Sequence, residues 1–344
     1  MKTINLESKT ERRFFSDKLT KSLASSNINI LLGSGFSKPL LSVLGSIEER
    51  LTEAKRNDDK TKIYKIEKEF FDSCIMPLKD YDNIVKTNPL RNRFIHSLID
   101  ILSVRHSSVL HKVLNIFTTN YDNLIEISLE EKHVDYFDGF TGKISSVFSS
   151  NNYGKIVSKQ SAVNNKTSEL VSVNLFKLHG SLYWYRDGNK IIFKDFKDRI
   201  SELEKFKDSP KEFVDYYENE FLIVNPNEEK YNLTVLNSTY YDQIRILSNE
   251  LDKNNTLLIS FGFSFNDDHL KTIIDRALEN PTLNLIIFAF DEASLNSYIE
   301  KFKHVNNVSI LYACNNQDEN NPIYKQLTLE YAGSYLEEIY NAIE

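Results

Sequence analysis

The chain has 344 residues, of which 41% are hydrophobic and 26% are charged, and its formal net charge is −7. This length suits one large α/β domain that carries an inserted module, and the composition is that of an ordinary globular protein. The acidic balance argues against a general nucleic-acid-binding protein, which would show a basic surplus, so we expect no direct nucleic-acid binding.

The two cysteines, Cys74 and Cys314, cannot supply a four-cysteine zinc site. One disulfide would be a poor framework for a chain of this length, so we expect reduced structural cysteines and no zinc. The segment Met1–Thr20 is charged throughout and lacks the apolar core of a signal peptide. No stretch approaches the ~20 apolar residues that span a bilayer. These features predict a cytoplasmic protein that makes no membrane contact.

The first predicted strand, Asn27–Leu32, leads directly into the turn Gly33–Ser37 (GSGFS), and a helical pattern follows from about Pro39. Such a turn lets the backbone approach a pyrophosphate at a helix N-terminus. An ordinary strand-to-helix turn is the alternative, because the third glycine of the dinucleotide fingerprint is missing. The strongly charged residues from about 40 to 110 predict a helical insertion that lies over the sheet.

The second predicted unit is the strand Val113–Phe117, followed by the polar turn Thr118–Asp122 (TTNYD) and a helix through Glu131. Within this turn, Asn120 is an uncharged donor and acceptor that can hold a ribose hydroxyl or a water molecule. Asp122 is either a ligand contact or the N-cap of the helix.

Residues from about 136 to 230 predict a small irregular and helical module, which is interrupted by the strand Val173–Leu178. That strand ends at His179, and an imidazole side chain at this position can serve as a general base. A structural histidine is the alternative. The aromatic run Tyr183–Tyr185 either walls a pocket or belongs to the core. Residues 195–212 indicate a solvated helix or loop, and Phe221–Val224 a short strand.

The C-terminal part alternates strands and helices. The predicted elements are helix 232–252, strand Thr256–Phe261, helix Leu270–Leu278, strand Leu283–Phe290, helix 292–303, strand Val308–Tyr312 and helix 323–342. Gly262, Ser264, Asn266 and Asp267 form a polar loop that can bind nucleotide phosphates or ribose. Asp267 or Asp268 can also cap the next helix. Asp291 can hold an adenosine ribose, with a helix N-cap as the alternative.

This alternation predicts a Rossmann-like α/β fold with a mostly parallel sheet and helices on both faces. Ligands of such sheets bind beyond the carboxyl ends of the strands. The unusual polar and glycine residues lie at those ends, so we expect them to form one site.

Four segments resemble, in chain order, motifs of the sirtuin superfamily, the silent-information-regulator-like proteins. The Gly33–Ser37 turn resembles the family's Gly-Ala-Gly-x-Ser phosphate loop, and Thr118–Asp122 resembles its Thr-Gln-Asn-x-Asp motif. His179-Gly180 resembles the His-Gly motif, and Gly262–Asp267 resembles the Gly-Thr-Ser loop. The resemblance extends over about residues 27–290 and implies a single sirtuin-like domain over residues 1–344.

Details resemble the bacterial sirtuin-like proteins of anti-phage systems, namely Asp138–Phe140, the Lys177–Ser181 stretch, the Pro226…Lys230 element and Phe261–Asp268. That branch hydrolyses NAD⁺ to nicotinamide and ADP-ribose, and the loss of NAD⁺ halts the infected cell. The resemblance implies Asn120 and His179 as the catalytic pair. The contacts to NAD⁺ that it implies are Gly33, Ser34, Gly35, Ser37, Asp122, Gly262 and Ser264.

Two differences from the protein-deacylating sirtuins argue against the hypothesis that this chain is such an enzyme. The chain cannot build the family's four-cysteine zinc module, and Lys38–Leu41 replaces the family stretch that carries an arginine. The rival hypotheses are a protein deacylase or ADP-ribosyltransferase, a non-catalytic subunit that binds NAD⁺ or ADP-ribose, and a purely structural subunit. Retention of both Asn120 and His179 argues against the last two.

Regulation is expected because an unrestrained NAD⁺ hydrolase would kill its host. We expect control by self-assembly into a homo-oligomer or by a second protein. The family resemblance implies a HerA-like ATPase as a candidate partner.

Overall fold

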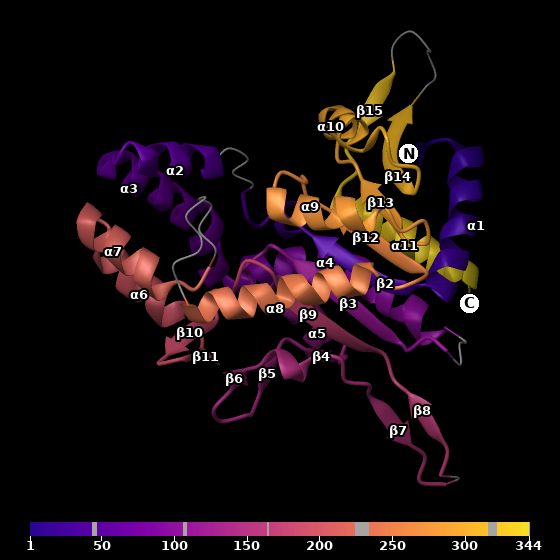
Figure 1. Cartoon of the computed structure of the whole chain (residues 1–344), viewed down its shortest axis with the longest axis horizontal. Helices are drawn as coiled ribbons and strands as arrows, with labels where there is room; N and C mark the ends of the chain where they lie inside the picture. Colours follow the sequence, from indigo (N-terminus) through magenta and orange to yellow (C-terminus); the bar gives the residue numbers. More distant parts are fainter. Residues whose placement is uncertain (43–46, 106–108, 164, 224–233, 316–321, 344) are drawn as a thin grey trace.

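The computed structural model describes residues 1–42, 47–105, 109–163, 165–223, 234–315 and 322–343. Within them the main sheet has nine strands, in the order β1-β14-β13-β12-β2-β3-β9-β4, with β15 added antiparallel to β14. The other pairings are parallel, which confirms the predicted Rossmann-like α/β fold (Figure 1). The strands are β1 (Lys2–Asn5), β2 (Asn27–Leu32), β3 (Val113–Thr118), β4 (Asp135–Phe137), β9 (Ser172–Lys177), β12 (Thr256–Phe261), β13 (Asn284–Phe288), β14 (Val308–Asn315) and β15 (Ile323–Lys325).

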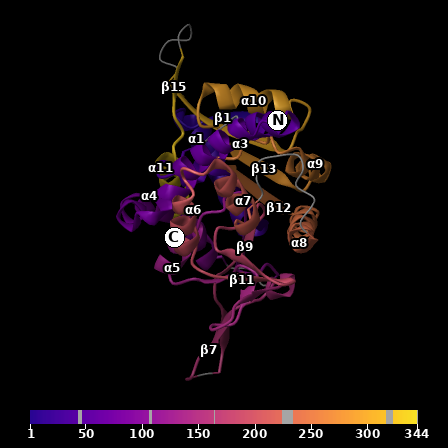
Figure 2. The same cartoon turned by 90° about the vertical axis from the view of Figure 1, so that its left-hand side faces the viewer.

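Helices cover both faces of this sheet. One face packs against α1 (Lys9–Ser25), α4 (Tyr81–Ser103), α5 (Leu124–Glu131) and α11 (Leu329–Ile343). The other packs against α8 (Thr234–Leu251), α9 (Asp268–Ala277) and α10 (Glu292–Phe302). Figure 2 shows α4 and α11 on one side of the sheet and α8 and α9 on the other. Successive strand residues point to opposite faces, so Ile30 joins the first core and Leu31 the second.

A row of asparagines crosses the centre of the sheet. Asn115 on β3 donates its Nδ2 to Oδ1 of Asn29 on β2 at 3.0 Å, and it accepts from Nδ2 of Asn174 on β9 at 2.9 Å. These residues are opposite one another in the strand register. Buried amide groups are costly unless they form hydrogen bonds, so this row favours the observed register of the largely apolar strands β2, β3 and β9.

The helical insertion predicted at about residues 40–110 and the module predicted at about residues 136–230 pack against each other. Helices α2 (Ile47–Arg56) and α3 (Lys60–Phe70), with the π-turn η2 (Phe71–Ile75), share a hydrophobic core with α6 (Lys197–Lys205) and α7 (Pro210–Glu220). Figure 1 shows these helices together at one end of the molecule. Helix α4, which the sequence placed in the same insertion, packs with α11 in the main core instead. We call α2, α3, η2, α6 and α7 the helical module.

Two smaller sheets complete the described structure. Four short strands form an antiparallel sheet in the order β10-β11-β6-β5, and β7 pairs with β8 in a hairpin. Their bounds are β5 (Phe140–Thr141), β6 (Val147–Phe148), β7 (Ser158–Gln160), β8 (Thr167–Glu169), β10 (Trp184–Asp187) and β11 (Lys190–Phe193). The hairpin extends away from the main sheet (Figure 1).

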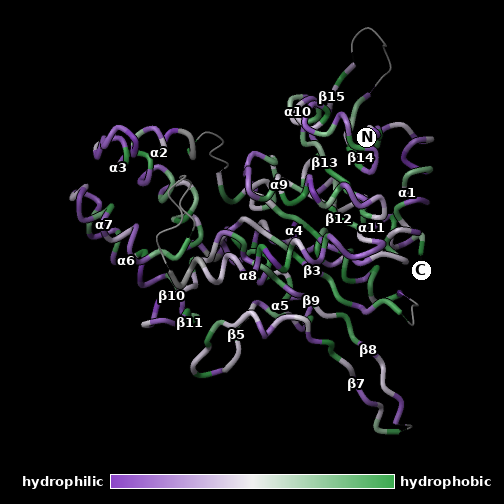
Figure 3. Tube along the Cα trace, in the orientation of Figure 1, coloured by the Kyte–Doolittle hydropathy of each residue, from purple (hydrophilic) through white to green (hydrophobic). Residues whose placement is uncertain are grey.

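Hydropathy follows these layers. Hydrophobic residues concentrate in the strands of the main sheet, and the helical module is mostly hydrophilic along its outer edge (Figure 3). In the described residues, no helix combines the length and the apolar character that crossing a bilayer requires.

Several predicted elements differ from the structure. The helix expected from about Pro39 is wrong, because the Gly33–Ser37 turn continues as a single 3₁₀ turn over Ser34–Ser37 and α2 begins at Ile47. The helix predicted over 323–342 starts only at Leu329, because Ile323–Lys325 pair with β14.

The remaining differences involve three further segments. Ile223 makes one isolated bridge to Gly180 rather than a strand, and Val224 with the Pro226…Lys230 element lies outside the described residues. Strand β1 and helix α1 were not predicted, since α1 buries only Phe15, Leu19 and Leu23 within a charged segment.

Substitution of Asn115 tests the asparagine row. Asn115→Ala leaves Asn29 Oδ1 and Asn174 Nδ2 without these partners inside the sheet. A buried polar group without a partner costs about 1–3 kcal/mol, so we expect the free energy of unfolding to fall by about 2 kcal/mol or more in urea titrations. The exposed Asn151→Ala is the matched control, with a change within about 0.5 kcal/mol. Equal effects of the two substitutions would contradict the role of the row.

A buried carboxyl in the helical module makes stability depend on pH. Burial raises the pKa of Glu67 to about 8, and the neighbouring Glu218 adds to this shift. The folded chain therefore holds a proton that the unfolded chain releases, so this contribution to the unfolding free energy falls as pH rises from about 4.5 to about 8. We expect Glu67→Gln to flatten the dependence of unfolding free energy on pH over this interval. Exposed Glu212→Gln is the control, and an unchanged slope in Glu67→Gln would refute the assignment.

Candidate functional site

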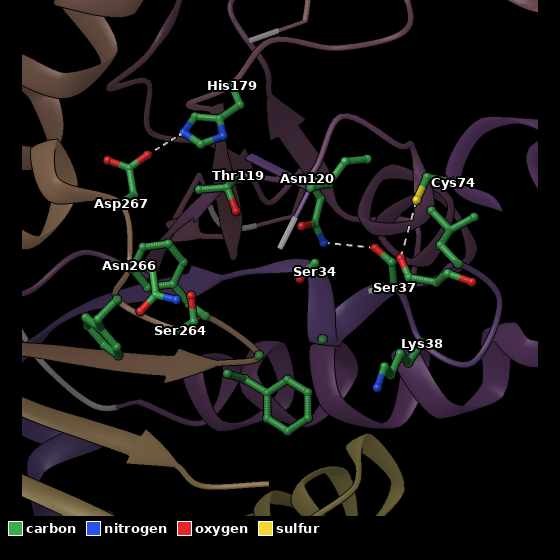
Figure 4. Close-up of a pocket in the computed structure, with 18 of the residues that line it drawn as sticks. Ser34, Ser37, Lys38, Cys74, Thr119, Asn120, His179, Ser264, Asn266 and Asp267 are labelled. Carbon is green, nitrogen blue, oxygen red and sulfur yellow. Dashed lines mark hydrogen bonds and ion pairs between the residues drawn. The ribbon is translucent and has the colours of Figure 1, made fainter. Parts of the chain in front are cut away.

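A cavity of about 1450 Å³ opens at the carboxyl ends of β2, β3, β9 and β12. It brings together most of the residues that the sequence predicted for a site (Figure 4). Those that line it are Ser34, Gly35, Ser37, Asn120, Asp122, His179, Gly262, Ser264 and Asn266. Gly33 and Asp291 are not among the lining residues. The helical module contributes part of the wall, including Phe70 and Cys74.

Asn120 follows β3, and its side-chain orientation is determined by two hydrogen bonds. Its Nδ2 donates to the carbonyl oxygen of Gly33 at 3.0 Å and to Oγ of Ser37 at 2.9 Å. A carbonyl oxygen can only accept, so the amide nitrogen must face Gly33. Oδ1 accepts no hydrogen bond from the described residues, and in Figure 4 it lies on the side of the cavity where His179 lies.

Ser37 and Asp122 support Asn120 from behind. The Ser37 hydroxyl donates to Asp122 Oδ2 at 2.6 Å, and both residues are 2% exposed. Asp122 Oδ1 also accepts from the Leu124 backbone N–H at 3.1 Å, at the start of α5. These polar atoms are therefore engaged with each other. The N-cap residue of α5 is Asn123, so the alternative role of Asp122 as the N-cap is wrong, although its Oδ1 binds the first N–H of that helix.

A buried ion pair extends this network. Lys177, the last residue of β9, donates to the backbone carbonyl of Asp122 and lies 2.9 Å from Glu126. Burial raises the pKa of Glu126 to about 7, and Lys177 opposes that shift. Burial likewise lowers the pKa of the Arg91 guanidinium, which the Asp122 charge opposes. Behind Asn120, polar side chains on β9, α5 and α4 thus form a buried cluster.

The glycine loops meet backbone to backbone. The N–H of Gly33 donates to Phe261 O and that of Gly35 to Gly262 O, each at 3.1 Å. A Cβ on Gly35 would lie 2.6 Å from Gly262 Cα, and one on Gly33 would lie 2.4 Å from Gly262 O. These N–H groups join two loops, and the expected long helix at this turn is absent. The glycines therefore allow the loops that follow the paired strands β2 and β12 to approach each other closely.

Lys38 is a cavity residue that sequence reasoning did not assign to binding. It follows the Gly33–Ser37 turn directly, and its Nζ lies 5.3 Å from the centre of the Phe290 ring. In the sequence, the one sign of a role for Lys38 was that Lys38–Leu41 replaces the family stretch that carries an arginine. Ser34 and Lys38 are both exposed and therefore contribute a hydroxyl donor and a cation to the cavity lining (Figure 4).

His179 follows β9 and pairs with a residue from another loop. Its Nε2 lies 3.0 Å from Asp267 Oδ2. The backbone after it turns sharply, since Gly180 has φ +80° and a Cβ there would lie 2.2 Å from Leu222 O. The sequence predicted Asp267 as a phosphate or ribose contact or as a helix cap, and the structure shows that its Oδ1 caps α9. The contact with His179 joins residues that are 88 positions apart.

The loop after β12 is held from α10. Lys301 Nζ donates to the backbone carbonyl of Ser264 at 2.8 Å and to Asn266 Oδ1. Tyr298 OH donates to Phe263 O at 2.9 Å. Asp291 caps α10, with Oδ1 accepting from Ser294 N at 2.9 Å in a capping box. The structure thus places Asp291 in the capping role and not at the cavity wall.

Cys74 lies in the cavity wall but is a poor nucleophile. Burial raises the pKa of its thiol to about 11, so it stays protonated near neutral pH. Cys314 is also free and buried. Among the described residues, no group of three or more His, Cys, Asp or Glu side chains is placed to hold a metal ion.

The contact between the glycine loops can be tested with matched substitutions. Gly262 has φ +67°, and an added Cβ would lie 2.7 Å from Gly35 Cα; Gly154 has φ +73° and nothing within 4 Å. Both Gly→Ala changes carry the left-handed backbone penalty of about 1–2 kcal/mol, but only Gly262→Ala also separates the loops. We expect a clearly larger fall in melting temperature for Gly262→Ala than for Gly154→Ala. Equal falls would show that the loop contact is not tight.

Comparison with known proteins identifies the family. The SIR2-like domain family matches residues 114–311, which is more than half of the chain. No curated protein matches the chain. The matched segment includes Asn120, His179 and the loop after β12, while the Gly33–Ser37 turn lies before it. SIR2-like domains are usually NAD-dependent enzymes, which implies NAD⁺ as a substrate. The chain belongs to the SIR2-like domain family.

Proposed function

We propose that this protein is an NAD⁺ hydrolase, which cleaves the nicotinamide–ribose bond and releases nicotinamide and ADP-ribose. The observation that carries the proposal is the geometry of Asn120. Its amide is held by Gly33 and Ser37, while its Oδ1 remains available in the cavity that also contains His179.

The size and the lining of the cavity support this proposal. Small-molecule pockets typically enclose about 300–1,000 Å³. A volume of about 1450 Å³ therefore has room for both nucleosides and the diphosphate between them. Ser34 and Lys38 supply a hydroxyl donor and a positive charge suited to the diphosphate.

Asn120 would act by positioning. An amide oxygen accepts a hydrogen bond from a ribose hydroxyl or from the attacking water molecule. Because Ser37 and Asp122 hold the amide rigidly, little conformational freedom is lost when the acceptor engages. This rigidity would explain why the buried residues Ser37 and Asp122 lie behind the uncharged Asn120 side chain.

His179 would act as the general base. The nicotinamide group of NAD⁺ carries a positive charge and leaves without needing a proton. The protein therefore has to remove a proton only from the attacking water or from a ribose hydroxyl, and an imidazole does this near neutral pH. His179 is mostly shielded from solvent, with 17% of its side chain exposed.

The biological role proposed here follows from the family resemblance. We propose that the protein acts in anti-phage defence by depleting NAD⁺. Control would come from self-assembly or from a partner such as a HerA-like ATPase, because free activity would harm the host cell.

Incubation of the purified chain with NAD⁺ tests the proposal, with nicotinamide and ADP-ribose followed by chromatography. We expect turnover in the wild type and a loss of at least about a hundredfold in both His179→Ala and Asn120→Ala. The exposed His304→Ala and Asn254→Ala are matched controls that should keep full activity.

The same assay separates the rival functions. O-acyl-ADP-ribose from an acylated peptide, or a labelled protein, would favour a deacylase or transferase. NAD⁺ binding without turnover, both alone and with candidate partner proteins present, would overturn the hydrolase proposal in favour of a binding subunit.

A further inference from the structure

The pairing of His179 with Asp267 joins the ends of two strands. His179 follows β9, and Asp267 stands at the end of the loop after β12, immediately before α9. Their Nε2 and Oδ2 atoms are 3.0 Å apart, and their side chains are 17% and 12% exposed. Partial burial strengthens such a contact because solvent screens it less.

The two oxygens of Asp267 have separate partners. Oδ1 accepts from the backbone N–H groups of His269 and Leu270, each at 3.1 Å, and so caps α9. Oδ2 faces His179. The helix end therefore fixes the carboxylate, and the carboxylate in turn fixes the imidazole ring.

This contact determines which ring nitrogen can be a base. A carboxylate has no hydrogen to donate, so Nε2 of a neutral His179 must carry the proton. Its lone pair then lies on Nδ1, on the side of the ring turned away from Asp267 (Figure 4). When Nδ1 accepts a proton, the charge of the imidazolium lies next to the carboxylate, which stabilises it.

We propose that Asp267 is a positioning residue, which holds His179 in the Nε2–H tautomer and leaves Nδ1 as the basic atom of the cavity. Its kinetic consequence rests on the proposed hydrolase function. The tautomer itself does not depend on any activity.

Two substitutions of Asp267 separate positioning from helix capping. Asparagine caps helices as well as aspartate does. If its Oδ1 keeps the cap, its Nδ2 faces His179 and favours the Nδ1–H tautomer, which has no basic atom at Nδ1. Glutamate restores a carboxylate but is a poorer cap. Positioning therefore ranks Asp267→Glu above Asp267→Asn in activity, while capping alone ranks them in reverse.

We expect Asp267→Asn to lower kcat by about a hundredfold with KM changed only a few-fold, because the loss of a general base acts on the chemical step. Asp267→Glu should retain more activity than Asp267→Asn. Asp80→Asn, at the cap of α4, is the matched control and should retain wild-type kcat. Equal kcat in Asp267→Asn and the wild type, or the reverse order of the two variants, would overturn the inference.

A second readout needs no turnover. Nitrogen-15 NMR of the imidazole groups reports the tautomer, with the His179 signals assigned by their loss in His179→Gln. We expect the Nε2–H form in the wild type and the Nδ1–H form in Asp267→Asn. The same tautomer in both proteins would overturn the inference. If the wild type fails to hydrolyse NAD⁺ but shows this change of tautomer, the function fails and the positioning role stands.

Discussion

Gly35 donates its backbone N–H to the carbonyl of Gly262, and the α-carbons of the two loops leave no room for a side chain between them. This contact sets how closely the loops after β2 and β12 approach each other. The Gly33 carbonyl, which orients Asn120, lies on one of these loops, and Asp267, which holds His179, lies on the other. The position of both candidate catalytic side chains thus depends on an approach that only glycine permits.

The main feature of the site is that other buried or partly buried side chains hold the Asn120 amide and the His179 imidazole in place. Ser37 binds both Asn120 and Asp122, and Lys177 binds the backbone of Asp122. Asp267 binds His179 and caps a helix. Several residues that a motif comparison assigns to the cofactor have their polar atoms engaged within the protein. Their structural effect is to orient Asn120 and His179.

The helical module forms part of the cavity wall. Its core joins helices from two distant segments, and Phe70 of that module packs against Tyr121 with ring centroids 5.4 Å apart. Tyr121 lies between Asn120 and Asp122. The module is therefore in contact with the candidate catalytic loop, although many of its residues are hydrophilic (Figure 3).

The sequence by itself determined the apolar strands, their parallel arrangement and the four loops at their carboxyl ends. Strands β2 and β12 have the predicted bounds, because a short apolar run between polar turns is a local pattern. Only the tertiary structure decided that Lys38 enters the cavity, that Asp291 stays at a helix cap and that Asp267 meets His179. It also decided that Ile323–Lys325 form a strand, since their partner is β14 and not a local turn. Hydrophobic period reports which face of an element is buried, whereas these contacts join loops far apart in the chain and depend on strand register and backbone approach.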